Sequence, residues 1–234
     1  MKIMTFNTQH CKSYLGGNID LALMADAIKQ CAPDVVGLNE MYGAGERPQF
    51  TAQVATLAAL AGYPYHSFAK AIDVGEGSNP YGNGFLSKLP IENVEVIPIP
   101  DPVVRSGKKL YETRSLLKAS LEGGITVLVT HFGLNPDEHR NATDTVVKHL
   151  AAEKCILMGD FNVLPDDPVL APIRAQMKDT AEMFDAPKLS WPSDVPRQKI
   201  DYIFVSPDID VIAADIPEIV ASDHRPHTAE VLLK

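Results

Sequence analysis

Short apolar runs, each ended or interrupted by a polar residue, recur along the whole chain. The runs cover residues 2–6, 35–38, 125–130, 155–158 and 200–205. Each is too short for an isolated helix and has the length of a buried strand. Several of the polar residues are carboxylates, which are costly at the end of a buried strand unless they are paired or bind a metal. The pattern therefore predicts buried strands whose ends collect polar side chains.

Longer segments with apolar residues at helical spacing separate these runs. They predict helices over residues 19–31, 50–60, 141–153 and 169–177. The prolines between positions 90 and 102 limit strands there to short or edge pieces, and Gly123-Gly124 indicates a hairpin turn. Residues 73–84 are rich in glycine and asparagine and predict a long loop. Because strands and helices mix without strict βαβ alternation, we expect two mixed or antiparallel sheets packed together, with helices outside.

Length and charge narrow the class of protein. The chain has 234 residues, enough for one large domain, and we expect a single domain over residues 1–234. Hydrophobic residues make up 45% and charged residues 22%, which is ordinary for a soluble globular protein. The net charge of −9 argues against broad, nonspecific binding of duplex nucleic acid. It allows a small phosphorylated substrate that is held through a metal ion.

Cysteine usage and the absence of long apolar stretches bear on location. The three cysteines, at positions 11, 31 and 155, have no CxxC spacing, which favours a reducing compartment. No stretch approaches the length of a membrane span, and the N-terminus lacks a signal-peptide pattern. We therefore expect a cytoplasmic protein that does not bind a membrane.

Residues 155–162 show the clearest strand end. Alternation along a strand places Asp160 and Asn162 on one side and Phe161 on the other. A carboxylate can accept a proton or a hydrogen bond, and a carboxamide can both donate and accept. The pair therefore suits the handling of a water molecule and a phosphoryl oxygen. The alternative is an Asx turn that closes the strand.

Polar residues of similar kind stand at other strand ends. They are Asn7, Glu40, His131, Asp223 and His224, and Asp201 lies within its own strand. Each one alone can be a turn former, a satisfied histidine or a helix cap. Together they are dominated by oxygen donors, which Mg²⁺ and Mn²⁺ prefer, and no thiolate or multi-histidine spacing supports a structural zinc. The set therefore predicts metal-assisted hydrolysis of a phosphate ester.

The order of these motifs resembles that of the endonuclease/exonuclease/phosphatase superfamily. The motifs are Phe6-Asn7, Leu38-Asn39-Glu40, Thr130-His131-Phe132, Gly159-Asp160-Phe161-Asn162, residues 200–205 around Asp201, and Ser222-Asp223-His224-Arg225-Pro226. Residues 82–91 resemble a further recurring segment of the family, and the set spans nearly the whole chain. The resemblance implies an α/β fold of the DNase I-like kind, a four-layer α/β/β/α sandwich. Two mixed sheets would pack face to face with helices outside, and the active site would lie at one end of the sheets.

The resemblance also implies roles around a divalent metal ion, Mg²⁺ or Mn²⁺. Glu40 would be the principal metal ligand, with Asp223 and Asn7 near the metal. Asp160 would orient or deprotonate the attacking water, and Asn162 would hold water or phosphate.

Further roles concern the histidines and the substrate. His224 would be held and polarised by Asp201, which fixes its tautomer. His131 would donate a proton or a hydrogen bond to the scissile phosphate. The residues assigned to substrate binding are Arg114, Asn83 and Asn135. The remaining histidines, assigned to the surface or to packing, are His10, His66, His139, His149 and His227.

Some positions depart from the family pattern or keep an alternative. Gln9 stands where the repair nucleases carry a second acidic residue, and His131 stands where they use an asparagine-type motif. Both departures point away from the abasic-site repair branch and towards DNase-, sphingomyelinase- or phosphatase-like members. For Arg114, the alternative is an ion pair on the strand surface with Glu112 or Glu122.

These observations lead to hypotheses from different classes. The first is a metal-dependent phosphoesterase acting on a small or soluble phosphodiester or phosphomonoester. The second is a nuclease, which the acidic balance disfavours because duplex affinity rests on phosphate neutralisation. A lipid phosphodiesterase would be expected to carry an apolar membrane-engaging loop or a targeting signal, and the sequence suggests neither. The third is a catalytically inactive binding module, which the presence of all motif residues disfavours. The oligomeric state stays open, and the substrate depends on loops 41–49, 73–84, 101–110 and 163–198.

Overall fold

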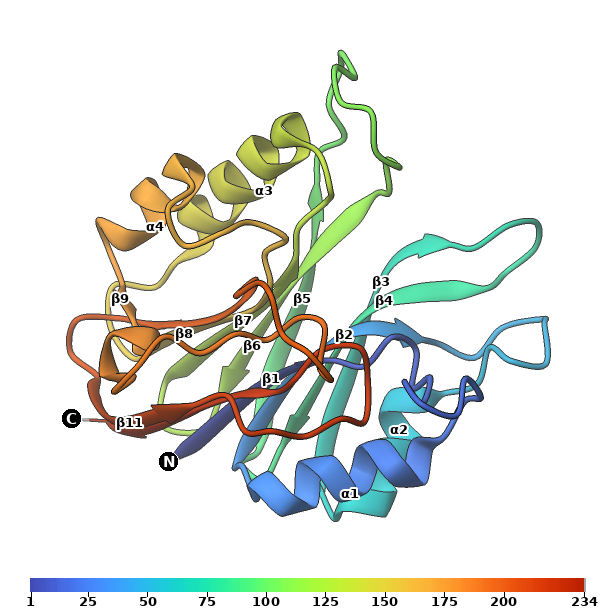
Figure 1. The fold of residues 1–234 in the computed structure, drawn as a ribbon, viewed down its shortest axis with the longest axis horizontal. Helices are drawn as coiled ribbons and strands as arrows, with labels where there is room; N and C mark the ends of the chain where they lie inside the picture. The colour runs from blue at the N-terminus through green and yellow to red at the C-terminus, as the bar shows by residue number, and fades with distance from the viewer. Residues whose placement is uncertain (234) are drawn as a thin grey trace.

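Two six-stranded sheets form the centre of the protein. The structure is a computed structural model that describes residues 1–233. The first sheet, in the order β11-β12-β1-β2-β4-β3, comprises β1 (Lys2–Asn7), β2 (Val35–Tyr42), β3 (Tyr65–Asp73), β4 (Pro80–Ser87), β11 (Asp210–Asp215) and β12 (His227–Leu232). The second, in the order β5-β6-β7-β8-β10-β9, comprises β5 (Ile91–Ile99), β6 (Arg114–Leu121), β7 (Ile125–His131), β8 (Cys155–Asp160), β9 (Lys178–Asp179) and β10 (Asp201–Val205). Figure 1 shows the two sheets side by side, with helices on their outer sides.

Each sheet is mixed, as the sequence predicted. β1 runs parallel to β2, and β7 runs parallel to β8. The remaining strand pairs are antiparallel. Both parallel pairs end at the same edge of the molecule, and the motif residues follow at that edge. The predicted strand ends therefore lie close together.

Four layers follow from how the apolar side chains alternate. Helices α1 (Leu21–Cys31) and α2 (Gln53–Ala61) pack on the first sheet, and α3 (Pro136–His149) and α4 (Ala171–Arg174) belong to the second. On β1, Met4 and Phe6 face the helices, whereas Ile3 lies between the sheets. The predicted four-layer α/β/β/α sandwich is confirmed.

The layer between the sheets changes from apolar to polar along its strands. Its apolar part includes Ile3, Val129, Met158 and Ile203, all fully buried. Two residues further on along β7 and β8 stand His131 and Asp160, and the same side of β1, β2 and β10 carries Asn7, Asn39 and Asp201. One end of the core therefore becomes a buried polar cluster, and it is the end that carries the predicted site.

A few predicted elements have different bounds. The helix predicted over 141–153 is α3, which begins at Pro136 because Asn135 and Glu138 form a capping box. The predicted loop 73–84 ends early, because β4 begins at Pro80 and includes Asn83. The proline-rich segment does form an edge strand, but β5 is nine residues long. The short strand β9 and the 3₁₀ turns at Pro168–Leu170 and Thr180–Met183 were not predicted.

Candidate active site

Asn7 links two carboxylates that come from different sheets. Its side-chain amide donates to Glu40 Oε1 and to Asp160 Oδ2, each at 3.0 Å. Asn7 and Glu40 lie on β1 and β2 of the first sheet, whereas Asp160 ends β8 in the second. The structure thus joins three residues that the sequence placed at three separate strand ends.

A buried histidine–carboxylate pair faces the same Asp160. His224 Nδ1 lies 2.8 Å from Asp201 Oδ2, and His224 Nε2 lies 3.7 Å from Asp160 Oδ2. All three side chains are buried. The predicted pairing of His224 with Asp201 is confirmed, and it fixes the orientation of the imidazole ring towards Asp160.

His131 also lies beside Asp160. Its Nε2 lies 3.6 Å from Asp160 Oδ2, and its Nδ1 lies 3.2 Å from Arg114 Nη1. A guanidinium and an amide NH₂ can only donate, so donors face both ring nitrogens: Arg114 Nη1 at Nδ1 and Asn162 Nδ2 at Nε2. Arg114 also pairs with Glu112 at 2.9 Å, so the ion pair named as its alternative is present. That ion pair holds the guanidinium against His131.

Asn162 turns back over His131. Its side-chain amide donates to Phe132 O at 3.1 Å and lies 3.3 Å from His131 Nε2. Its backbone N–H donates to Asp160 Oδ1 at 2.9 Å, which is the contact of an Asx turn. The turn and the polar cluster are therefore present together. Asn162 and Glu40 have φ angles of 52° and 60°, a left-handed backbone that non-glycine residues seldom adopt.

Asn39 is a site residue for which the sequence assigned no role. Its Oδ1 accepts from the Asp160 backbone N–H at 3.0 Å, and its Nδ2 donates to Thr130 O and to Asn83 Oδ1, both at 2.8 Å. It is fully buried and joins β2 to strands of the opposite sheet. The available signal was its position on the inward-facing side of β2, two residues after Gly37.

Two residues assigned to substrate binding make structural contacts instead. Asn83 is buried within β4, and its amide donates to Ser115 O at 2.8 Å, so it extends the Asn39 bridge. Asn135 caps α3, and its side chain bonds to Glu138 and to the backbone of Lys109. Both amides are therefore already occupied by structural hydrogen bonds.

The pKa values reflect the burial of this cluster. Burial raises the pKa of Asp160 to about 7, despite the opposing effect of His224. Burial lowers the pKa of His224, but the carboxylates of Asp201 and Asp160 outweigh this and raise it to about 10. Burial and the adjacent Arg114 hold the pKa of His131 well below its usual range. Near neutral pH the site therefore contains a cationic His224 and a neutral His131.

The donor set beside Asn7 fits a hard divalent cation. Burial, together with the negative charge of Asp223, raises the pKa of Glu40. The carboxylates of Glu40 and Asp223 therefore repel each other. The Asn7 carboxamide oxygen accepts from Gln9 N at 3.0 Å and keeps a second lone pair. Two carboxylates and one carboxamide oxygen are the ligand types that Mg²⁺ and Mn²⁺ prefer. Asp223 also accepts from the Ser222 hydroxyl at 3.0 Å, which orients its carboxylate.

A second group of potential ligands lies deeper. Asp160, Asp201 and His224 each offer an atom within 4.8 Å of the others. The proton on His224 Nδ1 already lies between the ring and Asp201 at hydrogen-bond distance. This group is therefore arranged for sharing a proton, and the Glu40 side of the site is the better fit for a metal ion.

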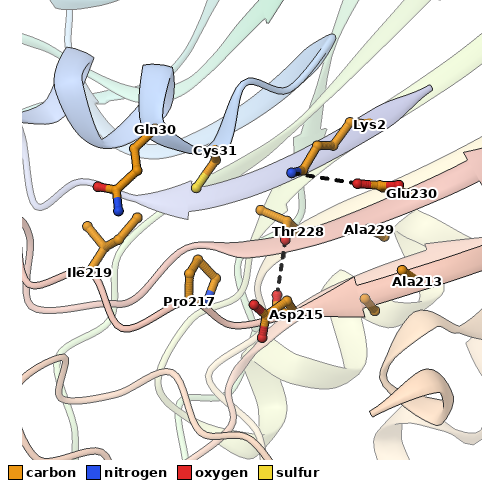
Figure 2. Close-up of a pocket in the computed structure, with 11 residues that line it drawn as sticks. Lys2, Gln30, Cys31, Ala213, Asp215, Pro217, Ile219, Thr228, Ala229 and Glu230 are labelled. Atoms are coloured by element: carbon orange, nitrogen blue, oxygen red, sulfur yellow. Dashed lines mark hydrogen bonds and ion pairs between the residues drawn. The ribbon is translucent and has the colours of Figure 1, made fainter. Parts of the chain in front are cut away.

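One hollow of the molecule lies away from the candidate active site. Figure 2 shows one of about 280 Å³ between the end of α1 and strands β1, β11 and β12. Lys2 bridges to Glu230 at 3.7 Å along its wall, and Thr228 donates to Asp215 O at 3.3 Å. None of the predicted site residues lines this hollow. The candidate active site is defined by its polar cluster.

The loop between β5 and β6 exposes apolar residues, although the sequence suggested no apolar membrane-engaging loop. Val103, Val104 and Leu110 are exposed to 101%, 75% and 72%. Figure 1 shows this loop, in green, projecting from the body of the protein. Among residues 1–233, none of the helices is long and apolar enough to cross a membrane.

Comparison with known proteins establishes the family. The profile of the Endonuclease/Exonuclease/phosphatase family matches residues 4–224. The chain therefore belongs to this family, whose members are hydrolases that act on phosphoester bonds. A comparison with curated proteins finds no match.

Solved structures share the fold. An endonuclease/exonuclease/phosphatase from Beutenbergia cavernae is 24% identical, with a TM-score of 0.79, and the match covers 100% of this chain and 71% of that one. A mannosyl-6-phosphatase from Bacteroides thetaiotaomicron is 16% identical, with a TM-score of 0.77 and 100% of both chains covered. A humanized D. rerio TDP2 is 18% identical, with a TM-score of 0.70, covering 99% of this chain and 98% of that one.

Proposed function

We propose that the protein is a divalent-metal-dependent hydrolase of a small or soluble phosphoester, with Mg²⁺ or Mn²⁺ as its cofactor. The observation that carries the proposal is the pair of hydrogen bonds from Asn7 to Glu40 and Asp160. They hold Glu40, a potential metal ligand, and Asp160, a potential base, at hydrogen-bond distance from the Asn7 side chain. A phosphate bound at the metal would then have Asp160 beside it.

Glu40, Asp223 and Asn7 would hold the metal ion. When bound, the ion would polarise a phosphoryl oxygen and stabilise charge on the leaving oxygen. Asp160, whose pKa is raised to about 7, is suited to accept a proton from the attacking water near neutral pH. The Asn7 and Asn162 hydrogen bonds hold the carboxylate of Asp160 in position for that transfer.

The two histidines would act on the phosphate oxygens in different charge states. His224, whose pKa is raised to about 10, is protonated at neutral pH, and Asp201 keeps its Nε2–H directed into the site. His131 stays neutral, and in the tautomer whose Nδ1 accepts from Arg114 it would offer an Nε2–H. A cationic donor and a neutral donor on one phosphate would stabilise the charge that develops in the transition state.

A small substrate suits the charge of the molecule. The net charge of −9 is unfavourable for duplex nucleic acid, whose affinity depends on phosphate neutralisation. The likeness in fold to a mannosyl-6-phosphatase supports testing sugar phosphates beside simple esters.

The test is hydrolysis by the purified protein with Mg²⁺, with Mn²⁺ and with EDTA. The panel contains p-nitrophenyl phosphate, bis-p-nitrophenyl phosphate, a hexose 6-phosphate, phosphocholine esters and plasmid DNA. We expect metal-dependent cleavage of a small ester that EDTA abolishes. Glu40→Ala should abolish it as well, whereas Glu92→Ala, on the exposed side of β5, should not.

Each other result has a defined meaning. Cleavage of plasmid DNA alone would replace the proposal by the nuclease hypothesis. No cleavage of any substrate, together with no binding of Mn²⁺ by calorimetry, would favour an inactive binding module. EDTA-resistant cleavage would remove the metal from the proposal.

A further inference from the structure

Three rings form a stack beside the candidate metal ligands. The rings of His10 and Tyr42 lie 4.7 Å apart and are nearly parallel, at 12°. The ring of Phe50 lies 4.1 Å from that of Tyr42 on the next level, at 28°. Phe50 is buried, whereas His10 and Tyr42 are half-buried. The stack therefore runs from the interior outwards and ends at the ring of His10.

A buried side chain fixes the two outer rings to each other. Gln53 is fully buried, and its Nε2 donates to His10 O at 2.8 Å. Its Oε1 accepts from the backbone N–H of Tyr42, also at 2.8 Å. One carboxamide thus satisfies a backbone group of each ring-bearing residue. A buried glutamine with both ends hydrogen-bonded holds the two backbone segments rigidly in one arrangement.

The backbone that carries His10 is strained. Gln9, His10 and Cys11 have φ angles of 48°, 47° and 60°, so three consecutive non-glycine residues are left-handed. Such residues persist only where surrounding contacts hold them, and they cluster at functional sites. Here the holding contacts include the hydrogen bond from His10 N to Glu40 O at 2.7 Å.

The stack lies against the metal side of the site. Tyr42 follows Glu40 by two residues on β2, and Gln9, next to His10, donates to Asn7 Oδ1 at 3.0 Å. The backbone N–H of His10 also donates to Glu40 O at 2.7 Å, which places the outer ring of the stack beside a candidate metal ligand.

We propose that the outer face of the His10 ring is a platform for a ring in the leaving group of the substrate. This rests on the proposed function and deepens it, because it names the substrate class as phosphoesters of a ring-bearing alcohol, such as a sugar or a nucleoside. A nucleobase stacks on an aromatic face, and a sugar ring can pack the C–H groups of one face against it, whereas an open-chain alcohol gains little. The three-ring stack supplies rigidity, so a ligand would not have to order the platform itself.

A binding measurement tests the platform without turnover. Phenylphosphonate and methylphosphonate differ in the ring and cannot be hydrolysed at their P–C bond, and calorimetry in the presence of Mg²⁺ gives their affinities. We expect His10→Ala to weaken phenylphosphonate binding about tenfold and to change methylphosphonate binding less than twofold. His10→Phe should restore the preference for the ring. His149→Ala, at the end of α3, is the matched control and should change neither affinity.

Steady-state kinetics separate the two sources of a ring. The substrates are mannose 6-phosphate, AMP and the open-chain glycerol 3-phosphate. If His10→Ala lowers kcat/KM through a raised KM for mannose 6-phosphate alone, the ring of the substrate is a sugar. If the variant does so for AMP alone, the ring belongs to a nucleoside. An equal loss for all three substrates, with unchanged thermal unfolding, would contradict the platform.

The platform and the proposed function fail in different ways. Absence of any hydrolysis, in wild type as well as variants, counts against the proposed function, while the phosphonates still decide the platform. Equal affinity of wild type for the two phosphonates, or no binding of phenylphosphonate, overturns the platform even if the protein hydrolyses esters. A preference for phenylphosphonate that survives His10→Ala unchanged overturns it as well.

Discussion

Asp160 is the residue on which the two sheets converge. Its carboxylate accepts from Asn7 in one sheet and from the backbone of Asn162 in the turn after β8, and its own N–H donates to Asn39. His224 Nε2 lies 3.7 Å away. A residue held by so many partners has one orientation, which is the condition for transferring a proton to or from a bound water.

At the residue scale we predict the effect of removing either proton-handling group. Asp160→Asn and His224→Ala should each lower kcat by about a hundredfold or more, because each removes a group suited to acid–base catalysis. The control is Asp166→Asn, the same change at an exposed position six residues after Asp160, which should keep wild-type turnover. Near-normal turnover in either site variant, with circular dichroism unchanged, would sink the roles proposed for these residues.

The sequence predicted individual site residues better than their contacts. Asn7, Glu40, Asp160 and Asp201 could be found because each lies at or in a buried strand, where an unpaired polar group is costly. The bridge made by Asn39 could not, because it depends on which strand of the opposite sheet lies across from β2. Which strands face each other is set by the packing of the two sheets, and the local sequence pattern does not predict it.

At the element scale, the sequence pattern did not predict where α3 begins, because capping rather than apolar periodicity sets its first turn. Its apolar periodicity begins at Ala142, but the helix begins six residues earlier. The first turn is held by capping: the Asn135 side chain accepts from the backbone of Glu138, and the Glu138 carboxylate accepts from the Asn135 N–H at 3.1 Å. The start of β4 was also missed, for a different local reason. A Cβ atom at position 82 would lie 2.0 Å from Ala69 O, so β4 requires a glycine there. In the sequence such a glycine predicts a loop.

The capping role of Asn135 gives a second prediction. Asn135→Ala should lower the free energy of unfolding by about 1 to 2 kcal/mol, because the first turn of α3 loses its cap. Asn135→Ser should recover most of this loss. Chemical denaturation measures both, and the KM for the preferred ester is the critical comparison. A raised KM in Asn135→Ala without any loss of stability would return Asn135 to the substrate-binding role.

At the scale of the whole molecule, polar bridges tie the sheets together across an otherwise apolar layer. His227 on β12 is fully buried and joins the first sheet to the second. Its Nδ1 donates to Asp201 O at 3.3 Å, and its Nε2 accepts from the Thr180 hydroxyl at 3.2 Å. The predicted packing role is confirmed, and both ring nitrogens are satisfied in the neutral ring.

This bridge makes stability depend on pH. Burial, with Lys199 adding to it, lowers the pKa of His227 to about 3, whereas the unfolded chain binds the same proton near 6.5. Between these values the unfolded state holds more protons, so the contribution of His227 is complete above pH 6.5 and is lost as the pH falls. The slope should approach about 1.4 kcal/mol per pH unit.

The check is chemical denaturation of wild type, His227→Gln and His149→Gln between pH 7 and pH 4. Subtracting the His227→Gln curve from the wild-type curve removes the shared carboxylate contributions. The difference should fall with decreasing pH, while His149→Gln follows wild type. A difference that stays flat would mean that His227 titrates normally in the folded protein.

The left-handed turn at Gln9, His10 and Cys11 has a consequence for anyone who engineers this protein. Glycine relieves such a backbone in the folded state, although it also adds freedom to the unfolded chain. Selection for heat resistance alone would therefore find substitutions in this turn that are neutral or beneficial to melting temperature. The same substitutions would loosen the residues next to Glu40, so gains in thermostability here should come at the expense of catalysis. Libraries for thermal robustness are better directed to the distant end of the sheets.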